Sequence, residues 1–225
     1  MGVIKTAMGD GMWTFLGNKI WLCIVCVYPI TIFITTVLIF VLVFVFSMIG
    51  DALGGASFNP IATAALYAAD VTPDSLISMA FRFPAQVAGA GGGTLAIMEV
   101  MPTQYRLMLG GPSLKVDLHT GAIAEGVLTF TISFLVLLVV LKGPKSPVLK
   151  TWLLAMTTVI LVVSGSTYTR PSMNPANAFG WAYINNWHNT WEQLYIYWIC
   201  PFIGAILAAW VFRFLLPAPT KQKKD

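Results

Sequence analysis

The sequence predicts an all-α polytopic membrane protein with six transmembrane helices and two re-entrant half-helices. Its composition is 57% hydrophobic and 10% charged, with a mean hydropathy of +0.78, which lies outside the range of soluble domains. The 225 residues leave room for about six spans of 20 residues with short loops. An Asn-Pro dipeptide occurs twice between apolar runs, 115 positions apart, and the same offset recurs along the chain. Together these observations indicate two copies of one membrane unit.

Each Asn-Pro dipeptide is expected to begin a short helix. Asn59 and Asn174 are preferred N-cap residues, and a proline suits the first helical position that follows each of them. The apolar stretches end near residues 69 and 183, so both helices are too short to cross a bilayer. We name these motifs the first box, Asn59-Pro60-Ile61, and the second box, Asn174-Pro175-Ala176.

The 115-residue offset holds without gaps over nearly the whole chain, which indicates an internal duplication. Among the pairs that it relates are Asp10 with Glu125, Thr14 with Thr129, Gly50 with Gly165 and Gly89 with Gly204. We expect a single membrane domain over residues 1–225, with repeat halves at about 5–100 and 120–216. Residues 101–119 link the halves, and residues 217–225 form a tail. Because three spans, an odd number, separate the halves, they are expected to be inserted in opposite orientations.

The spans differ in how clearly the sequence predicts them. The first lies within residues 7–28, where Asn18 and Lys19 fall in the middle, and a central lysine costs about 2.5–3.5 kcal/mol on insertion scales. Pro29 closes this span and the next apolar run starts at once, so the region looks shortened. The other spans are expected at residues 30–50, 75–100 and 120–141, from a lysine-rich loop to residue 165, and at 191–216.

The net charge of +4 does not indicate a nucleic-acid partner, because the basic residues are not gathered on one face with aromatic residues. They cluster in loops, and the larger group includes Lys5, the loop after the fourth span and the C-terminal tail. The positive-inside rule therefore places both termini in the cytosol. Three cysteines in apolar runs argue against a disulfide framework, and nothing completes a metal site around Cys23 and Cys26. We expect no metal, no cofactor and no catalytic residue.

The inverted halves bring the two half-helices together, N-terminus to N-terminus, near the middle of the membrane. Each presents unpaired backbone N–H groups and the positive end of its dipole. The side-chain amides of Asn59 and Asn174 add donors at the same place. A water molecule can donate and accept there, whereas a cation meets an electrostatic barrier.

This constellation resembles the aquaporin family over almost the whole chain. The resemblance is carried by the paired boxes, the acidic-x-x-x-Thr-Phe motifs that begin at Asp10 and Glu125, and the motif Gln86-x-x-Gly89-Ala90. Within the family, the altered first box, the basic balance and the short lysine-rich tail resemble the small basic intrinsic proteins of plants. The resemblance implies a passive water channel that also passes small neutral solutes, a homotetramer with one pore per subunit, and residence in the endoplasmic reticulum.

The resemblance also implies roles for particular residues. The selectivity region would be lined by Ile39, Val162, Pro171 and Asn177, where aquaporins usually have arginine at the last position. The re-entrant loops would be supported by Asp10, Thr14, Glu125 and Thr129. A proton relay through the two carboxylates is the alternative for Asp10 and Glu125. Lys221 and Lys223 resemble a dilysine retrieval signal, although a tail of this charge also suits the positive-inside rule.

Two other classes of function compete with a channel. A shortened first span favours a non-conducting or poorly active membrane subunit. An intramembrane hydrolase would use Ser166 as nucleophile and His188 as base, which must lie within hydrogen-bond reach of each other. A hydrolase leaves the gapless repeat unexplained.

Overall fold

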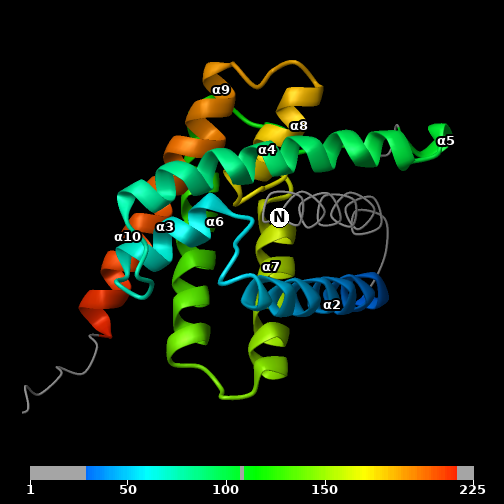
Figure 1. Ribbon diagram of the computed structural model, residues 1–225. Helices are drawn as coiled ribbons and strands as arrows, with labels where there is room; N and C mark the ends of the chain where they lie inside the picture. Colours follow the sequence, from blue (N-terminus) through cyan, green and yellow to red (C-terminus); the bar gives the residue numbers. More distant parts are fainter. Residues whose placement is uncertain (1–28, 107–108, 217–225) are drawn as a thin grey trace, which may run out of the picture.

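The computed structural model describes residues 29–106 and 109–216, and this part of the chain is helical and contains no strand (Figure 1). Its long helices are α2 (Pro29–Ala52), α4 (Leu76–Val100), α6 (Leu118–Leu141), α7 (Pro147–Gly165) and α10 (Cys200–Leu215). Its shorter elements are α3 (Pro60–Ala68), α5 (Thr103–Arg106), α8 (Pro175–Ile184), α9 (Trp191–Leu194) and a π-helical turn, η1 (Tyr195–Ile199). The predicted first span, Asp10, Thr14, Lys221 and Lys223 lie outside the described residues.

Side-chain caps explain where several helices begin. Ser75 accepts a hydrogen bond from Ser78 N at 3.1 Å, and α4 begins at the next residue. Asp117 accepts from His119 N at 3.1 Å and from Thr120 N at 3.0 Å. Because Asp117 caps the helix, α6 begins at Leu118, two residues before the start that the hydrophobic pattern predicts.

Four segments of the described ranges are long and apolar enough to cross a bilayer: Ile32–Ala52, Leu118–Leu141, Pro147–Gly165 and Trp191–Leu215. The fifth long helix, α4, has 25 residues, but it is less apolar because it carries Arg82, Gln86 and Glu99. Large apolar side chains point outward on these helices; Phe33 is 62% exposed and Phe214 is 85% exposed. Such surfaces are matched to lipid tails rather than to water.

The last predicted span has the expected limits but is not one regular helix. It consists of α9, the π-helical turn and α10, in which Cys200 N donates to Tyr195 O, five residues earlier. Pro201 follows directly and has no N–H to donate to the preceding turn. The widened turn therefore stands where the proline interrupts the regular hydrogen-bond pattern.

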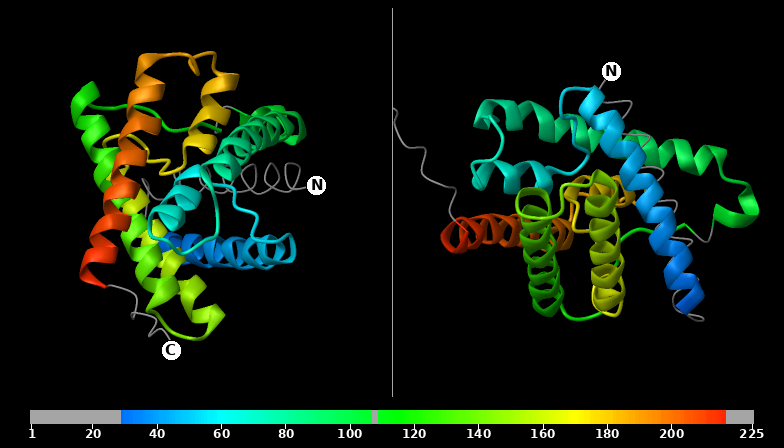
Figure 2. Two further views of the ribbon diagram at one scale, coloured as in Figure 1. Left: turned by 60° about the vertical axis from the view of Figure 1, so that its left-hand side comes forward. Right: turned by 90° about the horizontal axis from the view of Figure 1, so that it is seen from below.

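The two half-helices, α3 and α8, lie in the interior and each packs against a long helix from the other half of the sequence. The half-helix α8 packs on α4, and α3 packs on α10. A Cβ atom on Gly180 would lie 2.9 Å from the Ala90 carbonyl oxygen, so only glycine allows α8 to come this close to α4. The helices α6 and α7 lie side by side and are joined by a short loop (Figure 2), while α10 packs along α6 and α2 along α7. This arrangement encloses the N-termini of both half-helices.

Candidate functional site

Both half-helices begin at the proline of their box, with the asparagine as N-cap. The backbones of Asn59 and Asn174 are extended, with φ of −129° and −150°. Asn59 Oδ1 accepts from Ile61 N at 2.9 Å, and Asn174 Oδ1 accepts from Ala176 N at 3.1 Å and Asn177 N at 3.4 Å. The caps therefore use the carbonyl end of each side-chain amide and leave its NH₂ group directed away from its own helix.

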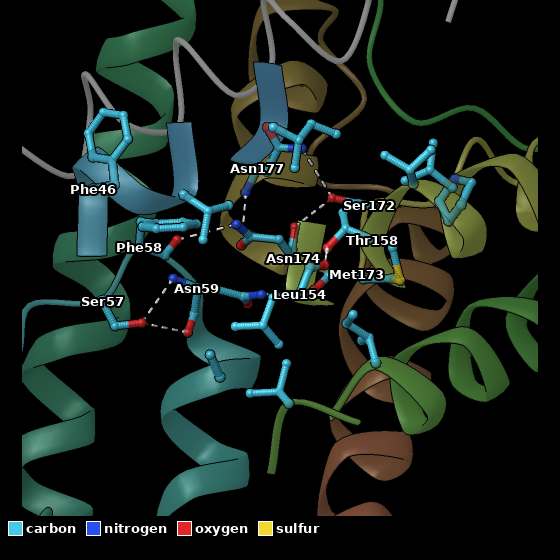
Figure 3. A pocket seen from close by; sticks show the side chains of 18 of the residues that line it. Phe46, Ser57, Phe58, Asn59, Leu154, Thr158, Ser172, Met173, Asn174 and Asn177 are labelled. Atoms are coloured by element: carbon cyan, nitrogen blue, oxygen red, sulfur yellow. Dashed lines mark hydrogen bonds between the residues drawn. The ribbon is translucent and has the colours of Figure 1, made fainter. Parts of the chain in front are cut away.

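The NH₂ groups join the two boxes to each other. Asn59 Nδ2 donates to Met173 O at 3.0 Å, and Asn174 Nδ2 donates to Phe58 O at 3.3 Å (Figure 3). Each asparagine thus binds the backbone directly before the other box. Residues 115 positions apart in sequence are brought face to face by this reciprocal pair of hydrogen bonds.

The loop before the second box is held by Glu125 of α6, whose side chain is fully buried. Its Oε1 accepts from Ser172 N at 2.7 Å and from Met173 N at 3.4 Å. Thr129, one turn further along α6, is also fully buried, but its hydroxyl has no hydrogen-bond partner within the described part of the chain. Of the two, Glu125 therefore makes the direct contact with the loop.

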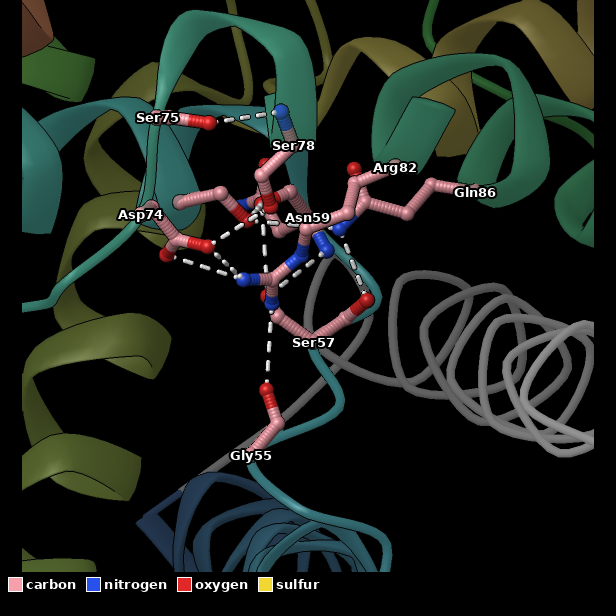
Figure 4. Close-up of polar contacts among 9 residues, drawn as sticks. Gly55, Ser57, Asn59, Asp74, Ser75, Ser78, Arg82 and Gln86 are labelled. Carbon is pink, nitrogen blue, oxygen red and sulfur yellow. Dashed lines mark hydrogen bonds and ion pairs between the residues drawn. The ribbon is translucent and has the colours of Figure 1, made fainter. Parts of the chain in front are cut away.

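The loop before the first box is held by residues of α4. Gln86 Nε2 donates to Ser57 O at 2.7 Å and to Thr63 Oγ1 at 3.3 Å. Arg82 donates to Gly55 O at 3.1 Å and forms an ion pair with Asp74 at 2.8 Å (Figure 4). Burial acts to raise the pKa of Asp74, but hydrogen bonds, above all from Arg82, and the charge of Arg82 outweigh it and lower the pKa.

A cavity of about 420 Å³ passes both boxes. Its wall combines α2 and α7 with the loops before the two boxes and the segment Gly110–Pro112. Asn59 and Asn174 both line it, so the amides that join the boxes also face the open space. Pro60, Ile61, Pro175 and Ala176 are not among the described residues of the wall.

The four residues expected at the selectivity region, Ile39, Val162, Pro171 and Asn177, all line this cavity. They come from α2, α7, the loop before the second box and α8. We call the loops before the two boxes the first loop and the second loop. Asn177 Nδ2 donates to Ser172 Oγ at 3.3 Å, and Ser172 Oγ donates to Asn174 O at 2.7 Å. Part of the hydrogen-bonding capacity of Asn177 is therefore used inside the loop.

The branched side chain of Ile61 points away from the cavity. It is 2% exposed and packs with Ala65, Ala205 and Phe202, between α3 and α10. Isoleucine at this position of the first box therefore fills the contact between two helices. It does not narrow the open space between the boxes.

The structure adds residues that the sequence did not assign to the site. The sequence placed Gln86 only in a motif and gave Arg82 and Arg170 no role, although Arg82 holds the loop before the first box and Arg170 lines the cavity. No local pattern pointed to Arg82, because its partner Gly55 lies 27 residues earlier.

Ser166 and His188, the residues of the hydrolase alternative, share no hydrogen bond in the described part of the chain; His188 packs against the rings of Phe179 and Tyr183.

The arrangement of these helices and half-helices is that of an aquaporin-type membrane protein. The structure is similar to that of the aquaglyceroporin from Plasmodium falciparum, with a TM-score of 0.71 over 93% of each chain, at 16% sequence identity. At that identity the similarity concerns the fold.

The sequence identifies the family. The sequence model of the Major intrinsic protein family matches residues 16–212, and the chain belongs to this family. It is 66% identical over 193 residues to Aquaporin SIP1-2 of Zea mays, an alignment that covers 85% of this chain and 79% of the relative. It is 49% identical to Aquaporin SIP1-1 of Arabidopsis thaliana, with 100% and 98% covered. These relatives are small basic intrinsic proteins, and the chain is accordingly an integral membrane channel protein, not an enzyme.

Proposed function

We propose that the chain is a passive water channel of the endoplasmic reticulum that also admits small neutral solutes. The observation that carries this proposal is the pair of asparagines that join the half-helices and line one cavity. Each NH₂ group has two hydrogens, and a single hydrogen bond to the opposite backbone leaves the second available to a passing water molecule. The positive ends of two helix dipoles at the same point oppose the passage of cations.

The proposed selectivity region consists of Ile39, Val162, Pro171 and Asn177. Three of these side chains are apolar, and the fourth is a neutral amide already bonded to Ser172. Water that passes these walls regains few of the hydrogen bonds that it loses. We therefore expect modest water permeability and weak discrimination against small neutral solutes.

The surrounding features of the proposal come from the sequence and the family. They are two inverted halves of one membrane domain, both termini in the cytosol, and a homotetramer. Lys221 and Lys223 would return the protein to the endoplasmic reticulum. A tagged chain with both lysines changed to Ala should move to later membranes, and a wild type found at the plasma membrane would contradict this address.

A second candidate is a poorly conducting membrane subunit. The alignment with the Arabidopsis thaliana relative is 241 positions long, more than the 225 residues of this chain, so some aligned positions have no residue here. The second candidate rests on the sequence itself, in which the first predicted span and its following loop look shortened.

Osmotic shrinkage of proteoliposomes separates the two candidates. If the cavity conducts, vesicles that contain the wild type should shrink faster than protein-free vesicles. Val162→Trp should remove the difference, because Val162 lines the cavity and the larger ring fills it. Ile160→Trp is the matched control, since Ile160 lies on the same helix and is 58% exposed. Shrinkage no faster than that of empty vesicles would favour the non-conducting subunit.

A further inference from the structure

The cavity wall carries two formally charged residues among the described positions, Asp51 and Arg170. Asp51 lies at the end of α2, just before the first loop, whereas Arg170 lies in the loop that leads to the second box. In the inverted arrangement proposed above, these two loops enter from opposite faces of the membrane. The acidic residue then belongs to the cytosolic end of the cavity and the basic residue to its other end.

The position of the Arg170 guanidinium is set by its surroundings. A Cβ atom on Gly110 would lie 3.6 Å from one of its terminal nitrogens, so the guanidinium lies beside Gly110, itself part of the cavity wall. The segment that follows Gly110 is tied to the second loop: Ser113 N donates to Thr169 O at 3.0 Å, and Lys115 N donates to Tyr168 O at 2.8 Å. The charge thus lies where two parts of the wall are joined by backbone hydrogen bonds.

Arg170 has a strained backbone conformation, and the residues on either side of it hold it there. Its φ is +45°, in the left-handed region that side chains other than glycine rarely adopt, and it precedes Pro171, which further restricts it. Thr169, the residue before it, is buried, and its carbonyl accepts from Tyr197 Oη at 3.1 Å as well as from Ser113 N. The fixed loop on one side and the proline on the other therefore hold the arginine in this orientation.

Arg170 supplies a charge that Asn177 does not have. Both residues line the cavity, but Asn177 is neutral and donates to Ser172. A second cation, Lys115, lies close by and donates from Nζ to Ser166 O at 3.0 Å. Burial and the charge of Arg170 lower the pKa of Lys115, which agrees with a positive field at this end of the molecule.

We propose that Arg170 determines the charge selectivity of the non-cytosolic mouth of the cavity. Its fixed positive charge lowers the local concentration of cations and raises that of anions before either reaches the boxes. The inference rests on the proposed function only in taking the cavity as the route of the solute. It adds a second barrier to cations, separate from the dipoles of the half-helices.

A cysteine reporter in the cavity tests this charge directly. Val162→Cys is introduced after Cys23, Cys26 and Cys200 are replaced by Ala, and its modification is timed with anionic, cationic and small neutral methanethiosulfonates. The anionic reagent should react faster than the cationic one. Arg170→Gln should lower the ratio of the two rates about threefold or more, the size expected for one charge several ångströms away in water. Arg170→Lys should keep most of the ratio.

Arg106→Gln is the matched control. Arg106 lies beyond the end of α4, donates to Met101 O at 3.1 Å and does not line the cavity, so its replacement should leave the ratio unchanged. Equal ratios for the parent and Arg170→Gln would overturn the inference. So would a thiol that even the neutral reagent cannot reach, since the mouth would then be closed.

The outcome is independent of whether water passes. If Arg170→Gln lowers the ratio of anionic to cationic modification rates but the protein shows no water flux, the proposed function is wrong and the inference about Arg170 stands. A conducting protein with no ratio change would end the present inference alone.

Discussion

The two boxes have the same cap chemistry, but the loops that lead into them are held in different ways. The first loop turns at Gly54 and Gly55, which adopt φ of +73° and +81°, and α4 holds it through Gln86 and the Arg82–Asp74 pair. The second loop has Arg170 and Met173 in the left-handed region; by the 115-residue offset Arg170 is equivalent to Gly55, whereas Met173 is equivalent to Phe58. A fully buried carboxylate, Glu125, accepts from its backbone.

The two half-helices differ in the same sense. Nearly every residue of α8 from Pro175 to Ala182 is buried, whereas the buried part of α3 is shorter. The first loop therefore depends on glycine and on a cluster near the surface, and the second depends on a buried acceptor and on packing. Loss of a support should accordingly cost more at the second box.

The largest effect is expected for Glu125→Ala. It leaves the N–H groups of Ser172 and Met173 without their acceptor, at about 1–3 kcal/mol each, so we expect a loss of about 2–6 kcal/mol in the free energy of unfolding. Gln86→Ala should cost less, because it removes one donor from the first loop. Thermal unfolding in detergent measures both, with Glu99→Gln, at an exposed carboxylate, as control. A Gln86→Ala variant less stable than Glu125→Ala would reverse the comparison.

Replacing the asparagines is the next test. Asn174→Ala and Asn59→Ala should each lower stability by about 0.5–2 kcal/mol through loss of the cap, with Asn174 toward the upper end because it caps two N–H groups. Both should reduce water flux per folded protein in proteoliposomes, since each removes a donor from the cavity. If flux per folded protein stays at the wild-type level in both variants, the site between the boxes is not the route of water.

A third change compares equivalent positions after the two boxes. Asn177 and Ala62 are related by the 115-residue offset, and both line the cavity. Asn177→Arg places a positive charge and several donors beside Pro171, so the ratio of water flux to glycerol flux should rise several-fold. Ala62→Ser, at the equivalent position, should leave the ratio nearly unchanged. Water and glycerol flux in the same vesicles give the answer, and an unchanged ratio in Asn177→Arg would remove Asn177 from the constriction.

The smallest effect is expected at the surface cluster of the first loop. The pKa of Asp74 is lowered in the folded protein, so its contribution to stability is complete above the ordinary value of 3.8 and is lost as the pH falls through the folded value. The contribution should be about 0.5 kcal/mol, as for an ion pair that solvent still partly reaches. Unfolding of wild type and Asp74→Asn between pH 7 and pH 3 measures it; the two curves should converge at the acid end, and parallel curves would contradict the assignment.

The elements were predictable from the sequence to the extent that short-range chemistry determines them. The N-cap and proline of each box predicted α3 and α8, and apolar length predicted α2, α6 and α7. Asp117 moved the start of α6, and the π-helical turn before Pro201 was not expected, because a hydrophobic run looks the same with or without a widened turn.

The supports of the site were harder to predict because they join distant positions. The sequence and the family resemblance pointed to Glu125, yet the roles of Gln86 and Arg82 depend on how α4 lies against the first loop. The direction of Ile61 depends in the same way on where α10 packs. The residue pattern of one helix does not determine how a second helix lies against it.

The reciprocal bonds between the boxes have a consequence for the order of synthesis. Asn59 needs the backbone before the second box, and Asn174 needs the backbone before the first. While the ribosome has made only the first half, the amide of Asn59 has no partner from the second half. More than a hundred further residues must be synthesised before that partner exists. The bonds between the boxes therefore form only after the second box has been made, and during that interval the first loop is open to a chaperone or to the insertion machinery.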